Sequence, residues 1–397
     1  MTILCIASYE KGHAFLRECK HQGATVLLVT SLSLKEKHQF PADAIDEIFY
    51  MPDVDNTWNR EDLIKSVSYI ARHREIDRVV ALDDFDVEVA AALREHLRLP
   101  GMGDTIVRYF RDKLAMRMKA RESGIPVPEF IHVLNHRALQ RFMDRVPPPW
   151  VLKPRSMAGA IGIKKVQNQD EFWPMLDALG DMQSQYLLEQ FVGGDVFHVD
   201  SIAIDREPVF AIASAYGRPP MEVAHQGDVF TTRILERDSE VAATLLATNR
   251  DVLATLGLVR GVSHTEFIRG NADGKIYFLE TSARVGGAHI AELVEAATGL
   301  NLWAEWAKVE WNKDYAVTPP REEYAGLLVS LSKQEHPDTS AYNDPEVVWR
   351  MDDKEHHVGL IVRSSSADRV KELLAQYVER VKQDFWASLP PQEKPSH

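Results

Sequence analysis

Two glutamates, Glu266 and Glu280, stand in neighbouring segments that could hold a metal ion. The segments, 263–267 and 275–280, alternate in the manner of β-strands, and the Asp273-Gly pair between them is a strong hairpin signal. A hairpin centred there places the two carboxylates opposite or nearly opposite each other, where like charges repel. We therefore expect a positive group between them. Mg²⁺ bound to phosphate oxygens prefers such ligands, and two solvated carboxylates on an exposed face are the alternative.

A lysine and a loop of small residues form a candidate anion site. Lys153 stands at the exposed end of a short apolar strand, and the loop 155–162 that follows contains Ser156, Gly159 and Gly162. Small residues let backbone N–H groups approach phosphate oxygens, and the lysine supplies charge. No Gly-Lys-Ser/Thr closes the loop, so it is not a P-loop. A plain connection between two strands is the alternative.

A third segment, 187–195, is a strand that runs into the bend Gly193-Gly194 and ends on Asp195. A purine can lie against such a segment, with main-chain groups reading its edge and an acidic side chain holding a ribose. A central strand with an exposed bulge is the alternative.

Other polar residues have two readings each. His264 alternates onto the face of Glu266, where it could contact a phosphate or a carboxylate, or it could be a satisfied histidine in the core. Asp83, Asp84 and Asp86 most simply cap the helix that follows them, although ligands also gather at that end of a parallel sheet.

The first hundred residues must form the first domain of the scaffold that positions these residues. Strand-like and helical patterns alternate there, which predicts an α/β, Rossmann-like, doubly wound domain with a mostly parallel sheet. The predicted strands are 2–7, 25–30, 45–50 and 79–82, and the helices are one ending before Gly23, 60–73 and 87–97.

The rest of the chain is of mixed α+β character. A helix at 106–122 ends at Gly124, and a small subdomain follows with the order strand, helix, strand, loop, strand, helix. The chain is strand-rich from 186 and then helical to 311. Residues 324–386 read as strands, a hairpin through 347–363 and an amphipathic helix, and residues after Pro390 read as a frayed tail.

Composition excludes several classes of protein. The 397 residues are 45% apolar and 26% charged, as in globular proteins, and no stretch has the roughly 18 apolar residues that a membrane span requires. The net charge of −13 argues against nucleic-acid and anionic-membrane partners. Cys5 and Cys19 are expected to be buried, reduced thiols. The N-terminus lacks the basic region of a signal peptide, so we expect a cytoplasmic protein.

Taken together and in this order, these elements over roughly residues 1–310 resemble the ATP-grasp superfamily. The resemblance implies an N-terminal domain at 1–104, an ATP-grasp domain at 105–318 with a lid subdomain at about 126–185, and a C-terminal α+β domain and tail at 319–397. It implies phosphate contacts by Lys113, Lys153, Ser156, Gly159 and Gly162, an adenine hinge at Glu189, Phe191 and Val192, and a ribose contact by Asp195. It also implies magnesium ligands at Glu266 and Glu280, and Arg284 as the arginine that holds the substrate or an acyl-phosphate.

Two positions depart from the pattern of the superfamily. Ser282 stands where asparagine is usual, and its shorter side chain could reach a second Mg²⁺ only closely or through water. Asp195 is one methylene shorter than the glutamate that is common at the ribose. Two further residues are candidates for the same site: Arg218 near the γ-phosphate and His289 at the substrate.

The segments around Glu266 and Arg284 look most like the branch of amino-acid and dipeptide ligases. The function implied is a carboxylate–amine ligase that uses ATP and Mg²⁺, with Mn²⁺ as an alternative ion, and forms an acyl-phosphate. The expected substrates are small acids and amines, mainly amino acids, and a homodimer is compatible with the sequence. The alternatives are a biotin-carboxylase-like or phosphoribosylamine–glycine-ligase-like enzyme, or a nucleotide-binding protein without turnover, for which Ser282 is the one hint.

Overall fold

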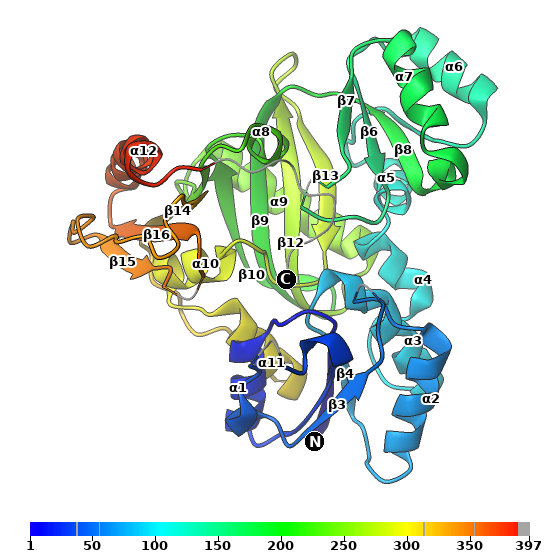
Figure 1. Cartoon of the computed structure of the whole chain (residues 1–397), viewed down its shortest axis with the longest axis vertical. Helices are drawn as coiled ribbons and strands as arrows, with labels where there is room; N and C mark the ends of the chain where they lie inside the picture. The colour runs from blue at the N-terminus through cyan, green and yellow to red at the C-terminus, as the bar shows by residue number, and fades with distance from the viewer. Residues whose placement is uncertain (37–38, 55, 160, 313, 353, 388–397) are drawn as a thin grey trace.

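Three β-sheets of four, eight and four strands carry the fold (Figure 1). The computed structural model describes residues 1–36, 39–54, 56–159, 161–312, 314–352 and 354–387, with the backbone alone at 224–226. The tail predicted after Pro390 lies outside the described residues.

The N-terminal sheet is parallel, with the strand order β3-β2-β1-β4. Successive residues of β1 point to opposite faces: Ile3 packs with Phe15 of α1 on one face, and Leu4 packs with Leu93 of α3 on the other. Both faces are thus covered, and the predicted Rossmann-like, doubly wound domain is confirmed. The elements are β1 (Thr2–Ala7), α1 (His13–His21), β2 (Thr25–Ser31), β3 (Glu47–Met51), α2 (Arg60–Ala71), β4 (Arg78–Ala81) and α3 (Val87–Leu97), with short 3₁₀ helices at Leu32–Leu34, Ala42–Ala44 and Asp84–Asp86.

A small antiparallel sheet with two helices stands apart from the rest, at the upper right of Figure 1. Its strand order is β5-β8-β6-β7, and Trp150 and Phe172 lie in the core that the sheet shares with α6 and α7. The predicted succession of strands and helices is confirmed, but β8, beyond the expected limit at 185, also belongs to this sheet. The elements are β5 (Phe130–His132), α6 (His136–Arg145), β6 (Trp150–Pro154), β7 (Lys164–Val166), α7 (Gln169–Asp177), a 3₁₀ helix (Gly180–Gln185) and β8 (Tyr186–Gln190).

The central sheet has the order β13-β12-β9-β10-β11-β14-β16-β15, and all its pairings are antiparallel. Apolar clusters from the sheet pack against α5 and α9, and against α10 and α11. Its strands are β9 (Gly194–Ile204), β10 (Glu207–Tyr216), β11 (Phe230–Ile234), β12 (Arg260–Gly270), β13 (Ile276–Ser282), β14 (Tyr324–Leu331), β15 (Val347–Arg350) and β16 (His357–Ser364). The helices are α4 (Asp104–Val107), a 3₁₀ turn (Arg108–Phe110), α5 (Lys113–Glu122), α8 (Pro220–Gln226), α9 (Glu240–Leu256), α10 (Ile290–Thr298), α11 (Leu302–Trp311) and α12 (Ala367–Asp384).

The last strands of the chain continue the central sheet. β14 pairs with β11 through four residue pairs, from Phe230 with Val329 to Arg233 with Gly326. The boundary expected at residue 318 therefore falls in a connection, and the strands on its two sides belong to one sheet. The hairpin predicted through 347–363 is confirmed as β15 and β16.

Two expectations from composition also have structural counterparts. Cys5 and Cys19 are buried and unbridged, as predicted. Within the described part of the chain, no helix is both long enough and apolar enough to pass through a bilayer.

Candidate active site

Glu266 and Glu280 face each other across the hairpin of β12 and β13. The register pairs these two residues directly, and the pair two positions earlier on β12 is His264 with Ser282. The Tyr216 hydroxyl donates a hydrogen bond of 2.8 Å to Oε1 of Glu266. The hairpin and its facing carboxylates, which the Asp-Gly turn predicts, are confirmed.

Lys113 supplies a positive charge at this pair. It begins α5, where the Asp112 side chain caps the helix by accepting hydrogen bonds from the backbone N–H of Leu114 and of the residue after it. The Lys113 ammonium lies 2.8 Å from Oε2 of Glu280 and donates to the carbonyl oxygen of Met157 at 2.6 Å. Burial alone would raise the pKa of Glu280, but Lys113 and the second lysine of the site lower it to about 2. Glu280 is therefore held as a carboxylate.

The second lysine, Lys153, is buried, which corrects the expectation of an exposed strand end. Its ammonium pairs closely with Glu189 of the adjacent strand β8, and Arg117 of α5 lies 3.1 Å from the other oxygen of Glu189. Burial lowers the pKa of Lys153 to about 8, against the opposing effect of Glu189. Burial would raise the pKa of Glu189, but the two cations lower it. The pair across β6 and β8 explains why a lysine can lie inside the protein.

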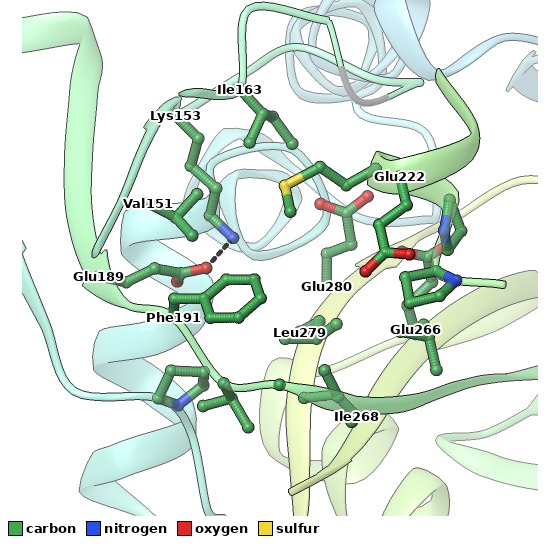
Figure 2. Close-up of a pocket in the computed structure, with 18 of the residues that line it drawn as sticks. Val151, Lys153, Ile163, Glu189, Phe191, Glu222, Glu266, Ile268, Leu279 and Glu280 are labelled. Atoms are coloured by element: carbon green, nitrogen blue, oxygen red, sulfur yellow. Dashed lines mark ion pairs between the residues drawn. The ribbon is translucent and has the colours of Figure 1, made fainter. Parts of the chain in front are cut away.

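A cavity of about 390 Å³ lies between the small sheet of β5 to β8 and the central sheet. One part of its wall is apolar, formed by Val151, Ile163, Phe191, Val192, Met221, Ile268 and Leu279. The other part is charged, formed by Lys153, Glu189, Glu222, Glu266 and Glu280. Figure 2 shows the carboxylates of Glu222, Glu266 and Glu280 gathered on one side, across the cavity from Phe191 and Val151. Such a wall suits a molecule with a flat apolar end and a charged end.

A second cavity, of about 230 Å³, adjoins the first and shares Glu266 and Glu280 with it. Arg284 and Ser282 line it from the end of β13, and Asp84 lines it from the N-terminal domain. The two cavities meet at the facing glutamates. Two molecules can therefore lie against each other at this pair of carboxylates.

A buried hydrogen-bonded chain lies beneath Glu266. Asp200 accepts hydrogen bonds from Nδ1 of His198 at 2.7 Å and from Nδ1 of His264 at 2.9 Å. Burial alone would lower the pKa of His264, but Asp200 raises it to about 9. Nε2 of His264 then lies 3.7 Å from Glu266. His264 is thus both a satisfied buried histidine and a neighbour of the carboxylate pair, so the two readings of its sequence position are compatible.

The backbone of Gly286 lies close over this chain. A Cβ atom at Gly286 would stand 3.0 Å from Oδ1 of Asp200 and from Nδ1 of His264. Only glycine lets the loop that carries Arg284 come this near to the buried pair. At Gly287, by contrast, a Cβ atom would meet nothing within 4 Å.

Several predicted site residues lie apart from the described residues that line the two cavities. Asp195 pairs with Arg269 at 2.7 Å, and its side chain is 61% exposed. Gly162 packs against the ring of Pro154, and Ser156 belongs to neither cavity wall, whereas Gly159 lines both cavities.

The two further candidates make other contacts. Arg218 pairs with Asp228 and lies 3.3 Å from Glu222. His289 lies 3.7 Å from Glu292, and its ring lies 4.8 Å from that of Trp349. Asp83 accepts a hydrogen bond from the N–H of Phe85 and so caps the 3₁₀ helix at Asp84–Asp86. The longer helix α3, for which the capping role was predicted, has Asp86 at its N-cap without a hydrogen bond from the side chain.

Arg117, Asp200 and Glu222 are site residues that the sequence analysis missed. For Arg117 a signal was present, because it stands one helical turn after Lys113 and so shares its face of α5. Asp200 and Glu222 come near the site only through the pairing of β9 with β12 and through the return of the chain at α8. No local sequence pattern predicts either contact.

The residues present fit a magnesium ion. Two carboxylates directly paired across a hairpin, with the Ser282 hydroxyl beside them on the wall of the second cavity, are hard oxygen donors of the kind that Mg²⁺ takes together with phosphate oxygens. The Lys113 ammonium, which is paired with Glu280, supplies the positive charge beside the two carboxylates.

Residues 146–292, which carry this arrangement, match the sequence pattern of the ATP-grasp domain. The chain carries an ATP-grasp domain. The matched segment contains both glutamates, Lys153, Glu189 and Arg284, and Lys113 lies before its start.

Curated proteins similar to this chain include a named ligase. The chain is 22% identical over 279 residues to the L-arginine-specific L-amino acid ligase of Bacillus subtilis, and the match covers 69% of this chain and 66% of that protein. The chain therefore spans just under two thirds of the length of this relative.

Solved structures share the fold over nearly the whole chain. The crystal structure of L-amino acid ligase from Bacillus licheniformis has a TM-score of 0.72 at 17% identity and covers 99% of both chains. Phosphoribosylglycinamide synthetase from Anaerococcus prevotii has a TM-score of 0.71 at 14% identity, covering 98% of this chain and 99% of that one. At these identities the likeness establishes the fold.

Proposed function

We propose that this protein is an ATP-dependent ligase that joins a carboxylate to an amine through an acyl-phosphate. The observation that carries the proposal is the meeting of two cavities at Glu266 and Glu280, with Lys153 on the wall of the larger cavity and Lys113 and Arg284 on the wall of the smaller one. A nucleotide in the first cavity would present its terminal phosphate to an acid in the second.

The nucleotide end of the reaction uses the larger cavity. The apolar wall around Phe191 and Ile268 suits the adenine ring, and Lys153 and Lys113 would release their carboxylate partners to contact phosphate oxygens. Mg²⁺ held by Glu266 and Glu280 would neutralise charge on the phosphates. The contribution of the protein is then mainly positioning and electrostatic stabilisation.

The acid end of the reaction uses the smaller cavity. A carboxylate oxygen attacks the γ-phosphorus, the bond to the β-phosphate oxygen breaks, and ADP leaves. The amine nitrogen then attacks the acyl carbon and loses a proton, and inorganic phosphate departs. The planar guanidinium of Arg284 can hold the acid or the acyl-phosphate with two hydrogen bonds. The lid would exclude water that otherwise hydrolyses this intermediate.

Amino acids are the proposed acid and amine. The support is the name of the Bacillus subtilis relative, together with a smaller cavity of about 230 Å³ that has both acidic and basic walls, Asp84 and Arg284 among them. A zwitterion needs both kinds of partner.

A test of the reaction class combines ATP, Mg²⁺ and pooled amino acids, with ADP measured by a coupled assay and dipeptides by mass spectrometry. Hydroxylamine in place of the amine should yield a hydroxamate. Arg284→Lys should reduce that yield sharply, because a point charge cannot reproduce the planar fork, while the matched variant Arg269→Lys, outside both cavities, should not.

Other outcomes of the same assay separate the alternatives. AMP and pyrophosphate instead of ADP would mean adenylation and would overturn the proposal. ADP formation that depends on bicarbonate alone would indicate a carboxylase, and nucleotide binding without any turnover would indicate a binding protein.

A further inference from the structure

The residue that was expected to contact the ribose of a nucleotide does not line the cavity. Asp195, to which the sequence analysis gave this role, extends out of the cavity and pairs with Arg269 at 2.7 Å. Strand alternation explains the outcome, because neighbouring residues of β9 point to opposite faces. Gly194 and Val196 line the cavity, and Asp195 between them does not. The position facing the nucleotide therefore carries an isopropyl group, which cannot hold a hydroxyl.

An acidic side chain does enter the cavity, from another element. Glu222 lies in the first turn of α8, and it lines the cavity together with its neighbours Met221 and Val223. Figure 2 shows its carboxylate directed into the cavity beside the facing glutamates. Its side chain is 41% exposed and lies 3.3 Å from Arg218, so one carboxylate edge has a partner on the protein.

The position of α8 is set by contacts at its far end. Asp228, just after the helix, pairs with Arg218 and lies 3.1 Å from Lys382 of α12. The indole N–H of Trp386 donates to the carbonyl oxygen of Gly227 at 2.7 Å. These contacts anchor the segment that presents Glu222 against the C-terminal helix.

The two ends of the cavity leave a middle that must hold the sugar. The base would lie against Phe191 and Ile268, and the phosphates would lie at Lys153 and the two paired glutamates, so the ribose would span the interval between the apolar and the charged wall. Glu222 borders this interval, because its neighbour Met221 belongs to the apolar wall and Glu222 itself to the charged wall. A carboxylate with a free edge is the group that accepts hydrogen bonds from two vicinal hydroxyls.

We propose that Glu222, presented by α8, binds the ribose hydroxyls of the nucleotide in place of Asp195. The inference rests on the proposed function only in requiring an ATP site, and it makes Glu222 a determinant of specificity for ribonucleotides.

The experiment compares the binding of ATP, 2′-deoxyATP and 3′-deoxyATP, each with Mg²⁺, to the full chain by calorimetry. The wild type should bind ATP about tenfold more tightly than either deoxynucleotide, the loss expected when a hydrogen bond to a charged, partly exposed group is removed. Glu222→Ala should bind all three with nearly equal affinity, and more weakly than the wild type binds either deoxynucleotide, because the variant loses both hydrogen bonds and each deoxynucleotide loses one. Asp195→Ala should keep the tenfold preference.

Three results would overturn the inference. The first is a Glu222→Ala variant that keeps the full preference for ATP. The second is an Asp195→Ala variant that loses this preference, which would restore the original assignment. A Glu222 variant that weakens all three nucleotides equally, and only when Mg²⁺ is present, would make Glu222 a metal ligand instead. Thermal unfolding of each variant excludes a folding defect.

Binding and turnover separate this inference from the proposed function. Ribose selectivity that depends on Glu222, in a protein that forms no hydroxamate, would support the inference and contradict the ligase. Hydroxamate formation without such selectivity would do the reverse.

Discussion

At the scale of single residues, the site is a set of ion pairs that nucleotide must exchange. Lys113 is paired with Glu280 and Lys153 with Glu189, so each proposed phosphate contact already has a protein partner. Charge balance inside the protein is thereby maintained before the ligand arrives. In the proposed reaction, binding would replace these carboxylate partners by phosphate oxygens and a metal ion.

The pairing reverses one expectation about Glu280. Two facing glutamates alone would repel, and removal of one charge would then stabilise the hairpin. With Lys113 at 2.8 Å the attraction dominates, as the lowered pKa of Glu280 indicates. Glu280→Gln should therefore lower the unfolding free energy of the ligand-free protein by roughly 1–3 kcal/mol at pH 7.5.

Urea unfolding of the two proteins measures this difference. A carboxyl group whose pKa is lowered by folding stabilises the protein above its unfolded value, and this contribution is lost as pH falls toward about 2. The difference between wild type and Glu280→Gln should therefore be smaller at pH 4 than at pH 7.5. A more stable variant at pH 7.5 would contradict the role given to Lys113.

Lys153 gives a prediction for the pH dependence of binding. Burial lowers the pKa of its ammonium to about 8 in the ligand-free protein, and contact with phosphate favours the charged form. ATP binding should therefore take up a proton at pH 8.5, and affinity should decline as pH rises above 8. Calorimetry in two buffers of different ionisation enthalpy counts the proton. Lys153→Arg, which stays charged, should show no uptake, and proton release by the wild type would contradict the model of phosphate contact.

The local sequence pattern was enough to predict a site residue only where a short stretch of neighbouring residues fixes its position. Glu266 and Glu280 were found because one turn sets their register, whereas Lys113 was named only through the resemblance to the superfamily. The pattern itself predicted a helix that begins at 106, and α5 begins at Lys113. The side of the strand on which Asp195 lies depends on the pairing of β9 with its neighbours, and a shift of one residue reverses it. The burial of Lys153 depends on β8, which follows in the chain some thirty-five residues later.

At the scale of elements, the loop after β13 depends on a close backbone approach. Gly286→Ala would bring a methyl group to 3.0 Å from Asp200, His264 and the side chain of Ile290. All three are buried, so the loop must shift, and we expect a loss of about 1–3 kcal/mol in unfolding free energy. Thermal unfolding measures it.

Gly287→Ala is the matched control, because a Cβ atom there meets nothing within 4 Å. Its stability should be close to that of the wild type. Equal losses of unfolding free energy in the two variants would mean that the close approach of the Gly286 backbone to Asp200 and His264 does not affect stability.

Elements with strong local signals were predictable, and their partners were not. The βα alternation of residues 1–104 predicted a parallel sheet, since the short connections leave little choice of topology. The pairing of β14 with β11 was not predictable, because about ninety residues separate the two strands and no pattern within either strand indicates which strand it pairs with.

At the scale of the whole molecule, the small sheet of β5 to β8 forms a unit separate from the other two sheets. It has its own core around Trp150 and Phe172, and β5 to β8 pair only with one another among the described strands. Nucleotide bound between this sheet and the central sheet should close the lid.

Hydrogen exchange with and without MgADP tests this expectation. Protection should increase in the loop at 155–163 and in β6 and β8, with β1 and β2 of the N-terminal sheet as the internal control. Equal change in both regions would indicate general stabilisation by binding.

The continuity of the central sheet through β14 and β16 also limits how this protein can be shortened. A chain that ended near residue 318 would keep every proposed catalytic group, yet β11 would present its unpaired N–H and C=O groups to solvent along the edge where β14 now lies. Open edges of this kind recruit strands from other chains. A premature stop or a proteolytic cut in the connection before β14 would therefore produce an aggregating fragment, even though no described residue after 318 lines either cavity.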